Sequence, residues 1–179
     1  MRIILIFIFL SNLVFAQTGK QKVAVTDLTR IKQIGSISPL IGDVYGYLAE
    51  ERYDEMVLTL MQIFSEIPYN LHMKDEKFYH ALLQIIFSAA GIETQSERLT
   101  SIGRMDMILE LPYAFYVVEL KIDEPPEKGL KQIEMQKYYE PFLYKGKPIR
   151  ALALSFLRKK ASNKENSHFT IDYAIKVLS

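Results

Sequence analysis

Two acidic residues and a lysine in the middle of the chain are spaced so that they could bind one ligand together. The segment Leu111-Pro112-Tyr113-Ala114 has the composition of a tight turn between two apolar runs, and proline suits the second position of a type I turn. A hairpin closed at this turn places Asp106 directly opposite Glu119 on the next strand. The two carboxylates then lie on one face of the sheet with their Cβ atoms about 5 Å apart. Lys121, two residues beyond Glu119, projects from the same face.

Two acids placed in this way need positive charge nearby. Like charges directly opposite each other destabilise a strand pair, and a divalent cation bound by both carboxylates removes that repulsion. Lys121 could then orient or deprotonate a water molecule, or neutralise charge that develops on a phosphate. The competing interpretation is a solvated Glu119–Lys121 pair on an exposed strand, with Asp106 as one more surface charge. The strongly apolar strand that ends in these residues favours the first interpretation, because unpaired charge is least expected there.

Hydrophobic periodicity predicts the elements that position these residues. Apolar residues recur at helical spacing from Tyr53 to Phe64, and a second helix, apolar nearly all round, is expected from about Asp75 to Ala90. Three strands, a helix opened by a proline pair and two further strands follow in this order: 92–99, 104–111, 115–122, 127–144, 149–156 and 168–174. The hairpin face away from the acids is uniformly apolar and is the predicted core side: Met105, Met107, Leu109, Leu111, Tyr116, Val118, Leu120 and Ile122.

Composition excludes several other kinds of site. The chain has 179 residues, a formal net charge of +1 and 49% hydrophobic residues. These values argue against a disordered chain and against the overall basicity of a packaging protein. With no Cys and three His, disulfide scaffolds, cysteine zinc sites and thiol nucleophiles are excluded, so any metal must be held by oxygen. The chain contains no phosphate loop, nucleophile elbow or dinucleotide fingerprint.

The N-terminus has the pattern of a secretory signal peptide. Arg2 precedes an apolar run from Ile3, and Val14 and Ala16 fit a cleavage site before Gln17. A functional signal would make the protein periplasmic or secreted, without stable membrane insertion after processing. The alternatives are an N-terminal anchor and a start codon assigned within a longer gene; without export the protein is expected in the cytoplasm. The predicted organisation is a signal peptide at 1–16, a linker at 17–45 containing Gly35, Ser36, Ser38 and Pro39, a helical extension at 46–70 and a domain at 71–179.

Three short motifs resemble a known family. Gly103-Arg104-x-Asp106, Glu119-x-Lys121 and Gln132-Ile133 resemble the motifs of the PD-(D/E)XK nuclease superfamily, in particular the nuclease-like domain found C-terminal to bacterial AAA-ATPase-like proteins. The similarity extends from about Tyr69 to the C-terminus. Further matches are Tyr79-His80, Glu97 and Tyr138. The resemblance implies an α/β (α+β) fold with a restriction-endonuclease-like αβββαβ core, in which helices flank a mixed central sheet, preceded by the helical extension.

The same resemblance implies a metal-dependent active site. The metal would be Mg²⁺ or Mn²⁺, and its implied ligands are Asp106, Glu119, the backbone carbonyl of Leu120 and, directly or through water, Glu97. Lys121 would position or activate the attacking water, and Gln132 would reach the site from the helix lying over the sheet. The implied reaction is hydrolysis of a phosphodiester, with the metal and the lysine stabilising the transition state.

The resemblance also implies binding partners. Nucleic acid, DNA in particular, is the expected substrate, and a one-sided basic rim is predicted from Lys145, Lys147, Arg150 and the segment 158–164. The ATPase that usually precedes such a domain is not within these residues, so a separate ATPase partner is a further expectation. Two alternatives stay open: a catalytically inactive nuclease-fold module that binds nucleic acid or protein, and an exported interaction protein.

Two residues of the second predicted helix also bear on the site. His80, alone on a mostly apolar helix, is expected to be a packed, hydrogen-bonded core residue rather than a ligand. Glu76, one turn earlier, could approach the metal, but the helix dipole also favours an acid at that position.

Overall fold

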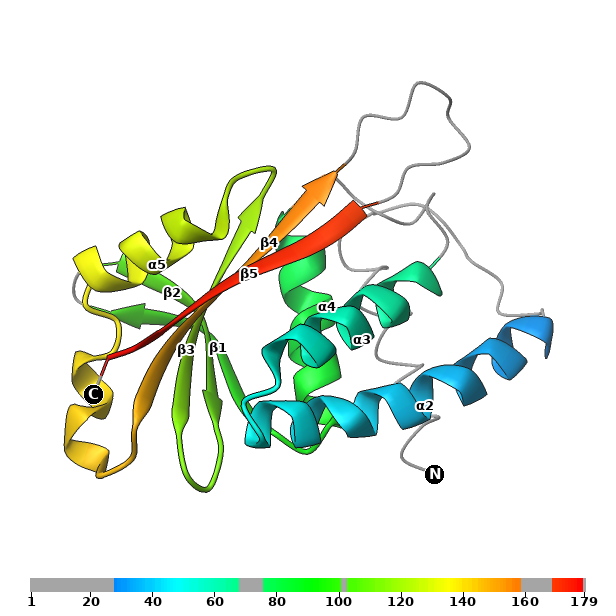
Figure 1. The fold of residues 1–179 in the computed structure, drawn as a ribbon, viewed down its shortest axis with the longest axis horizontal. Helices are drawn as coiled ribbons and strands as arrows, with labels where there is room; N and C mark the ends of the chain where they lie inside the picture. The colour runs from blue at the N-terminus through cyan, green and yellow to red at the C-terminus, as the bar shows by residue number, and fades with distance from the viewer. Residues whose placement is uncertain (1–27, 68–75, 101–102, 159–168, 179) are drawn as a thin grey trace.

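The computed structural model describes residues 28–67, 76–100, 103–158 and 169–178. The elements, in chain order, are α2 (Leu28–Ala49), α3 (Tyr53–Ser65), α4 (Glu76–Ala89), β1 (Glu93–Thr100), β2 (Gly103–Glu110), β3 (Phe115–Ile122), α5 (Pro126–Met135), the 3₁₀ helix η2 (Glu140–Lys145), β4 (Ile149–Arg158) and β5 (Phe169–Val177). From α4 onward this order is the predicted αβββαβ core with one strand added (Figure 1).

One five-stranded mixed sheet organises the molecule. Its strand order is β1-β2-β3-β4-β5. Only β3 and β4 pair in parallel, and the other neighbours are antiparallel. Two parallel neighbours need a crossover connection, and α5 with η2 provides it (Figure 1). The sheet and its flanking helices confirm the predicted fold class.

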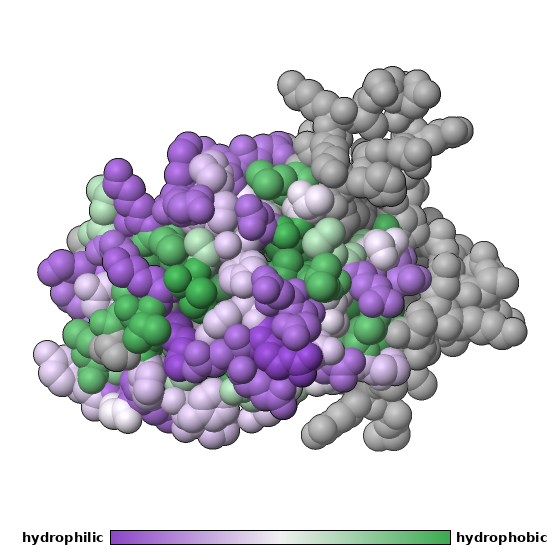
Figure 2. All heavy atoms as spheres, viewed as in Figure 1, coloured by the Kyte–Doolittle hydropathy of each residue, from purple (hydrophilic) through white to green (hydrophobic). Residues whose placement is uncertain are grey.

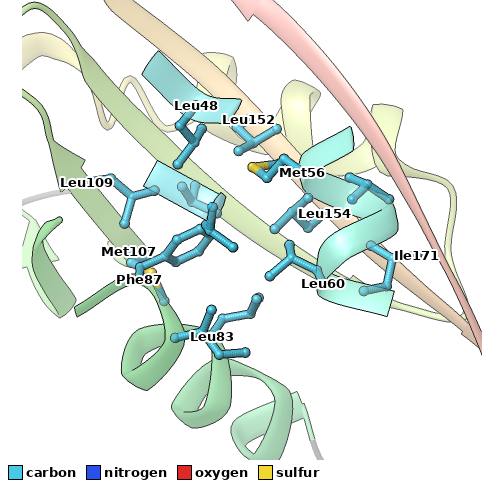
Figure 3. Packing of buried hydrophobic residues seen from close by; sticks show 14 of the residues in the cluster. Leu48, Met56, Leu60, Leu83, Phe87, Met107, Leu109, Leu152, Leu154 and Ile171 are labelled. Carbon is cyan, nitrogen blue, oxygen red and sulfur yellow. The ribbon is translucent and has the colours of Figure 1, made fainter. Parts of the chain in front are cut away.

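Strand β3 is central because both of its faces are covered. On one face Tyr116, Val118 and Leu120 belong to a cluster with buried residues of α2, α3 and α4, part of which is drawn in Figure 3. On the other face Phe115 and Val117 pack in a second cluster that includes a buried isoleucine of α5. A strand buried on both faces is expected to be continuously apolar, so a charged residue within it is an exception that needs explaining.

The molecular surface drawn in Figure 2 is mainly hydrophilic, with separate apolar patches.

The predicted hairpin has the predicted register. Strand β2 pairs with β3 from Glu110–Phe115 to Met107–Val118, and the Leu111 N–H donates to the Ala114 carbonyl at 2.9 Å across the turn. The ladder stops one residue short of the predicted Asp106–Glu119 pair. The prediction for Met105 was wrong: its side chain packs in the cluster under α5, whereas Met107 lies in the cluster on the opposite face. The alternation of β2 is therefore interrupted at Asp106.

The N-terminal part differs from the predicted linker at 17–45. Residues from Leu28 on form the single helix α2, which runs through Pro39. Its C-terminal half carries an apolar stripe at helical spacing: Ile37, Leu40, Ile41, Val44 and Leu48, all in or against the first cluster. Burial of this stripe outweighs the helix-breaking residues, because tertiary packing contributes more to helix stability than propensity does. Residues 1–16, the predicted signal peptide, lie outside the described residues.

Two other boundaries depart from expectation. The helix predicted at 127–144 ends at Met135, where Lys137 adopts a positive φ of 48°, and a 3₁₀ turn replaces its second half. At its start, Pro126 occupies the first turn as predicted. Within the described part of the chain, no helix is long and apolar enough to cross a membrane.

Candidate active site

Glu119 is a buried acid near the end of the central strand. Only 2% of it is exposed, and an uncompensated carboxylate in such a place is strongly unfavourable. One of its oxygens, Oε1, accepts a hydrogen bond from Lys121 Nζ at 2.9 Å. The other, Oε2, is buried and has no hydrogen-bond partner among the described residues. Half of this carboxylate is thus available to a further positive ligand.

Lys121 lies on the same side of the strand as Glu119, as the alternation predicts. Besides its ion pair with Glu119, its ammonium donates to the backbone carbonyl of Leu120 at 2.9 Å. The side chain is 13% exposed, so it stands between the buried acid and the surface. Its charge offsets part of the cost of burying Glu119.

Asp106 meets β3 through its side chain rather than through its backbone. The β2–β3 ladder stops at Met107–Val118. Beyond that pair, the backbone N–H of Leu120 donates to Asp106 Oδ2 at 2.9 Å. A carboxylate that accepts a main-chain N–H is held in a fixed orientation. Asp106 and Glu119 are thereby brought together across the two strands.

Electrostatics reflect this crowding of acids. The pKa of Glu119 is raised from its ordinary 4.5 to about 7, first because burial removes water from the carboxylate and second because Asp106 is a like charge nearby. The hydrogen bond and charge of Lys121 act in the opposite direction, and Glu76, at the start of α4, adds a smaller upward effect. One lysine therefore does not fully compensate the negative charge of the site.

The donor atoms suit a hard divalent cation. Asp106, Glu119 and the Leu120 carbonyl supply only oxygen, which Mg²⁺ and Mn²⁺ prefer. Glu119 Oε2 has no hydrogen-bond partner among the described residues and the pKa of the same carboxyl is raised, so either a proton or a bound cation would stabilise this group. Among the described side chains, no three of His, Asp or Glu converge as a metal cluster. Glu97 is on β1 between Ser96 and Arg98, whose partners Met107 and Met105 flank Asp106, but its side chain is outside the described part, so its role as a ligand stays a prediction.

Helix α5 covers Glu119 from the second face of the sheet. A Cβ atom added at Gly129 would lie 2.8 Å from Ala153 Cβ and 3.5 Å from Glu119 Cγ, so the absence of a side chain permits this close approach. Gln132, one turn further along α5, is half-buried. Ile133 beside it packs with Val117, so this turn lies over the strand before Glu119. The structure describes no hydrogen bond from Gln132 to the two acids, and its predicted catalytic role stays a prediction.

The basic residues predicted as one rim lie at two ends of the sheet. In the parallel β3–β4 pair, Arg150 is opposite Tyr116 whereas Lys121 is opposite Ser155. That separation is five residues, or about 16 Å along the strand. Arg150 pairs with Glu51, and Lys147 pairs with Glu110. These residues stabilise the far end of the sheet, which corrects the predicted rim. Strand β4 ends at Arg158, at the same end of the sheet as Lys121, and residues 159–168 lie outside the described residues.

One residue at the site was assigned only a structural role from the sequence. His80 on α4 lies with its Nε2 2.7 Å from the backbone carbonyl of Asp106. No sequence signal identifies this contact, since it joins a side chain to a main-chain atom 26 residues away.

Comparisons with known proteins agree with the geometry. The family model described as "PD-(D/E)XK nuclease superfamily" matches residues 74–166, just over half of the chain, and this segment holds Asp106, Glu119 and Lys121. A protein of Azotobacter chroococcum mcd 1, described as "Uncharacterized protein in vnfD 5'region", is 25% identical over 142 residues. The aligned part covers 75% of this chain but 28% of that relative. No solved structure matches the chain.

Proposed function

Because this chain belongs to the PD-(D/E)XK nuclease superfamily, we propose that it hydrolyses phosphodiester bonds in DNA with a divalent cation, Mg²⁺ or Mn²⁺. The observation that carries the proposal is the buried Glu119, which is paired on one oxygen with Lys121 and unpaired on the other. A purely structural acid would be expected to have both oxygens satisfied. A metal-binding acid instead keeps an oxygen free to coordinate the ion.

The residues that would hold the cation are Asp106, Glu119 and the Leu120 carbonyl, with Glu97 as an additional ligand. When bound, the ion would supply positive charge for the phosphate oxygens and lower the pKa of a bound water. The backbone N–H of Leu120 keeps the Asp106 carboxylate oriented. Lys121, anchored on Glu119 Oε1, would orient the attacking water and balance negative charge in the transition state. Gln132 is proposed to assist from α5.

Access for the substrate is proposed at the C-terminal end of β3 and β4. Lys121 is the most exposed member of the Glu119–Lys121 pair, and the basic sequence Arg158-Lys159-Lys160 begins at the adjacent end of β4. Lysine and arginine side chains attract the phosphate backbone without regard to base sequence. This end of the sheet is therefore the proposed DNA-facing side.

The proposal is tested by nuclease assays on plasmid and linear DNA with Mg²⁺, with Mn²⁺ and with chelator. Asp106→Ala and Lys121→Ala should each lower cleavage by about 10²-fold or more, the effect of removing one preorganised electrostatic group. Lys147→Ala is the matched control, because this lysine is also ion-paired but lies at the other end of the sheet. Cleavage that persists in both site variants would contradict the proposal.

A second candidate function is a catalytically silent module that binds nucleic acid. It is favoured by one observation: Lys121 already contacts two of the oxygens proposed for the metal, Glu119 Oε1 and the Leu120 carbonyl. An internal ammonium can replace a metal as counter-charge. This function predicts salt-dependent DNA binding without turnover and a melting temperature that hardly changes with Mg²⁺.

We further propose that residues 1–16 direct export and that a separate ATPase acts with this protein. The export proposal rests on the charged, apolar and small-residue pattern before Gln17. Mass spectrometry of the protein expressed from its full gene tests it. A mature chain beginning at Gln17 in the exported fraction is expected, and an intact Met1 in the cytoplasm would contradict it.

A further inference from the structure

Asp106 has no pairing partner on either neighbouring strand in the described part of the chain. On the β1 side, Ser96 pairs with Met107 and Arg98 with Met105, and among the described residues Asp106 has no partner between them. On the β3 side, the ladder ends one residue earlier, at Met107–Val118. Such a gap leaves main-chain groups to be satisfied by other means.

A side chain from α4 occupies this gap. His80, 8% exposed, lies with Nε2 2.7 Å from the Asp106 carbonyl oxygen. A carbonyl can only accept, so Nε2 carries the proton and donates. At the other end of the residue, the Leu120 N–H donates to Asp106 Oδ2. Asp106 is thus fixed at its carbonyl by a helix and at its carboxylate by a strand.

The gap coincides with the interruption of side-chain alternation in β2. Met105 packs under α5 and Met107 packs on the opposite face, although residues two apart in a regular strand share a face. The side-chain alternation of β2 is therefore shifted at Asp106. Its carboxylate accepts the hydrogen bond from the Leu120 N–H, which a regular ladder would give to a main-chain carbonyl.

We propose that His80 is a positioning residue for Asp106: its Nε2–H holds the Asp106 carbonyl out of the ladder and so aims the carboxylate at Leu120 and Glu119. That this orientation matters for metal binding rests on the proposed function. That His80 stabilises the Asp106–Leu120 hydrogen bond does not. Removing a group that hydrogen-bonds to a metal ligand and fixes its orientation typically lowers metal affinity by about 10- to 100-fold.

Two variants separate the hydrogen bond from packing. His80→Met introduces an apolar side chain of similar length and removes the Nε2–H donor. His80→Gln keeps an N–H donor at a similar distance from the backbone. Leu83→Val is the matched control, because Leu83 lies one turn along α4 in the apolar cluster (Figure 3) and has no polar contact to lose. All three are expected to lower stability to some extent, so stability alone does not distinguish them.

The first measurement needs no metal. Hydrogen exchange followed by NMR should show the Leu120 amide exchanging about 10-fold faster, relative to the Val118 amide in the intact ladder, in His80→Met. His80→Gln should recover most of the protection, and Leu83→Val should change both amides together. Two results would overturn the proposal. The first is that the exchange rates of the Leu120 and Val118 amides rise by the same factor in His80→Met, and the second is that His80→Gln does not restore the protection of the Leu120 amide.

The second measurement is titration calorimetry with Mn²⁺ alone. His80→Met should weaken Mn²⁺ binding by about 10-fold or more, and His80→Gln and Leu83→Val should remain within about twofold of the unsubstituted protein. Equal Mn²⁺ affinity in His80→Met and the unsubstituted protein would overturn the link to metal binding. A protein that shows the exchange effect but cleaves no DNA would instead refute the proposed function and leave the positioning role of His80 intact.

Discussion

Glu119 carries the main energetic cost of the site. It is buried, close to Asp106, and compensated on one oxygen by Lys121. Its raised pKa means that the folded protein keeps a proton which the unfolded chain releases. In the absence of metal, the acid is easier to bury protonated than charged, so the metal-binding role proposed for this residue would oppose stability.

This residue should give the protein a pH-dependent stability. The Glu119 pKa is about 7 in the folded state against its ordinary 4.5, so its stabilising protonation is fully present below about pH 4.5 and is lost as the pH rises through about 7. Without divalent ions, the free energy of unfolding should fall across this window by on the order of 3 kcal/mol more in the unsubstituted protein than in Glu119→Gln. Urea denaturation at a series of pH values measures this difference. The exposed Glu127→Gln should retain the full slope, and an unchanged slope in Glu119→Gln would refute the assignment.

At the scale of elements, the packing of helix α5 on strand β3 determines how deeply Glu119 is buried. Gly129 allows α5 to lie directly on Ala153 and Glu119, while α4 brings His80 to Asp106 from the other face. Helix α5 therefore covers the Glu119 side chain, and α4 contacts the main chain of Asp106. The close helix–strand contact is what buries Glu119.

Gly129→Ala should displace α5 and destabilise the protein. Alanine improves helix propensity by up to about 1 kcal/mol, but its Cβ would lie 2.8 Å from the Cβ of Ala153, and overpacking typically costs about 1–3 kcal/mol. A net loss of about 1 kcal/mol is expected in urea or thermal denaturation. Gly46→Ala in α2 is the control, since nothing lies within 4 Å of its added Cβ, and it should stabilise by about 0.5–1 kcal/mol. Equal effects of the two substitutions would show that α5 does not pack as described.

At the scale of the whole molecule, the N-terminal helices are part of the domain core. Buried residues of α2 and α3 share one apolar cluster with α4 and the sheet (Figure 3). The Tyr116 hydroxyl donates to the Leu48 carbonyl at 3.1 Å, and Arg150 on β4 pairs with Glu51 in the α2–α3 connection. The segment predicted as an extension therefore covers one face of the sheet.

A chain that begins at residue 71 should consequently fail to fold cooperatively. Removing α3 alone takes five buried apolar side chains from the core: Met56, Val57, Leu60, Ile63 and Phe64. Each contributes about 1.5–3 kcal/mol when fully buried, so their sum is comparable to a typical total stability of about 5–15 kcal/mol. Circular dichroism with urea denaturation should show a broad transition for residues 71–179 and a sharp one for residues 28–179. A sharp transition of equal stability in both chains would contradict this role of α2 and α3.

Local sequence patterns were sufficient for the order of the elements from α4 onward and for the β2–β3 hairpin. The turn at Leu111–Ala114 and the alternation around it predicted the register observed from Glu110–Phe115 to Met107–Val118, and they placed Lys121 on the side of Glu119. The predicted Asp106–Glu119 pair lies one residue beyond this ladder. These features depend on neighbours within about 15 residues, whose geometry follows from the two-residue period of strands. The αβββαβ order was predictable for the same reason. The early end of α5 at Met135, the helix α2 around Pro39 and the face on which Met105 packs were not.

What the tertiary structure alone decided is how this site is enclosed and held. The burial of Glu119 depends on α5 packing at Gly129, the hydrogen bond at the Asp106 carbonyl is made by His80, and the helical state of the segment around Pro39 depends on apolar contacts with α3 and α4. Each of these is a contact between segments distant in sequence, and its free energy comes from burial and hydrogen bonding that no local pattern records. The amino-acid sequence determined which groups lie near one another along the hairpin, and the packing of distant elements determined how deeply they are buried and how they are oriented.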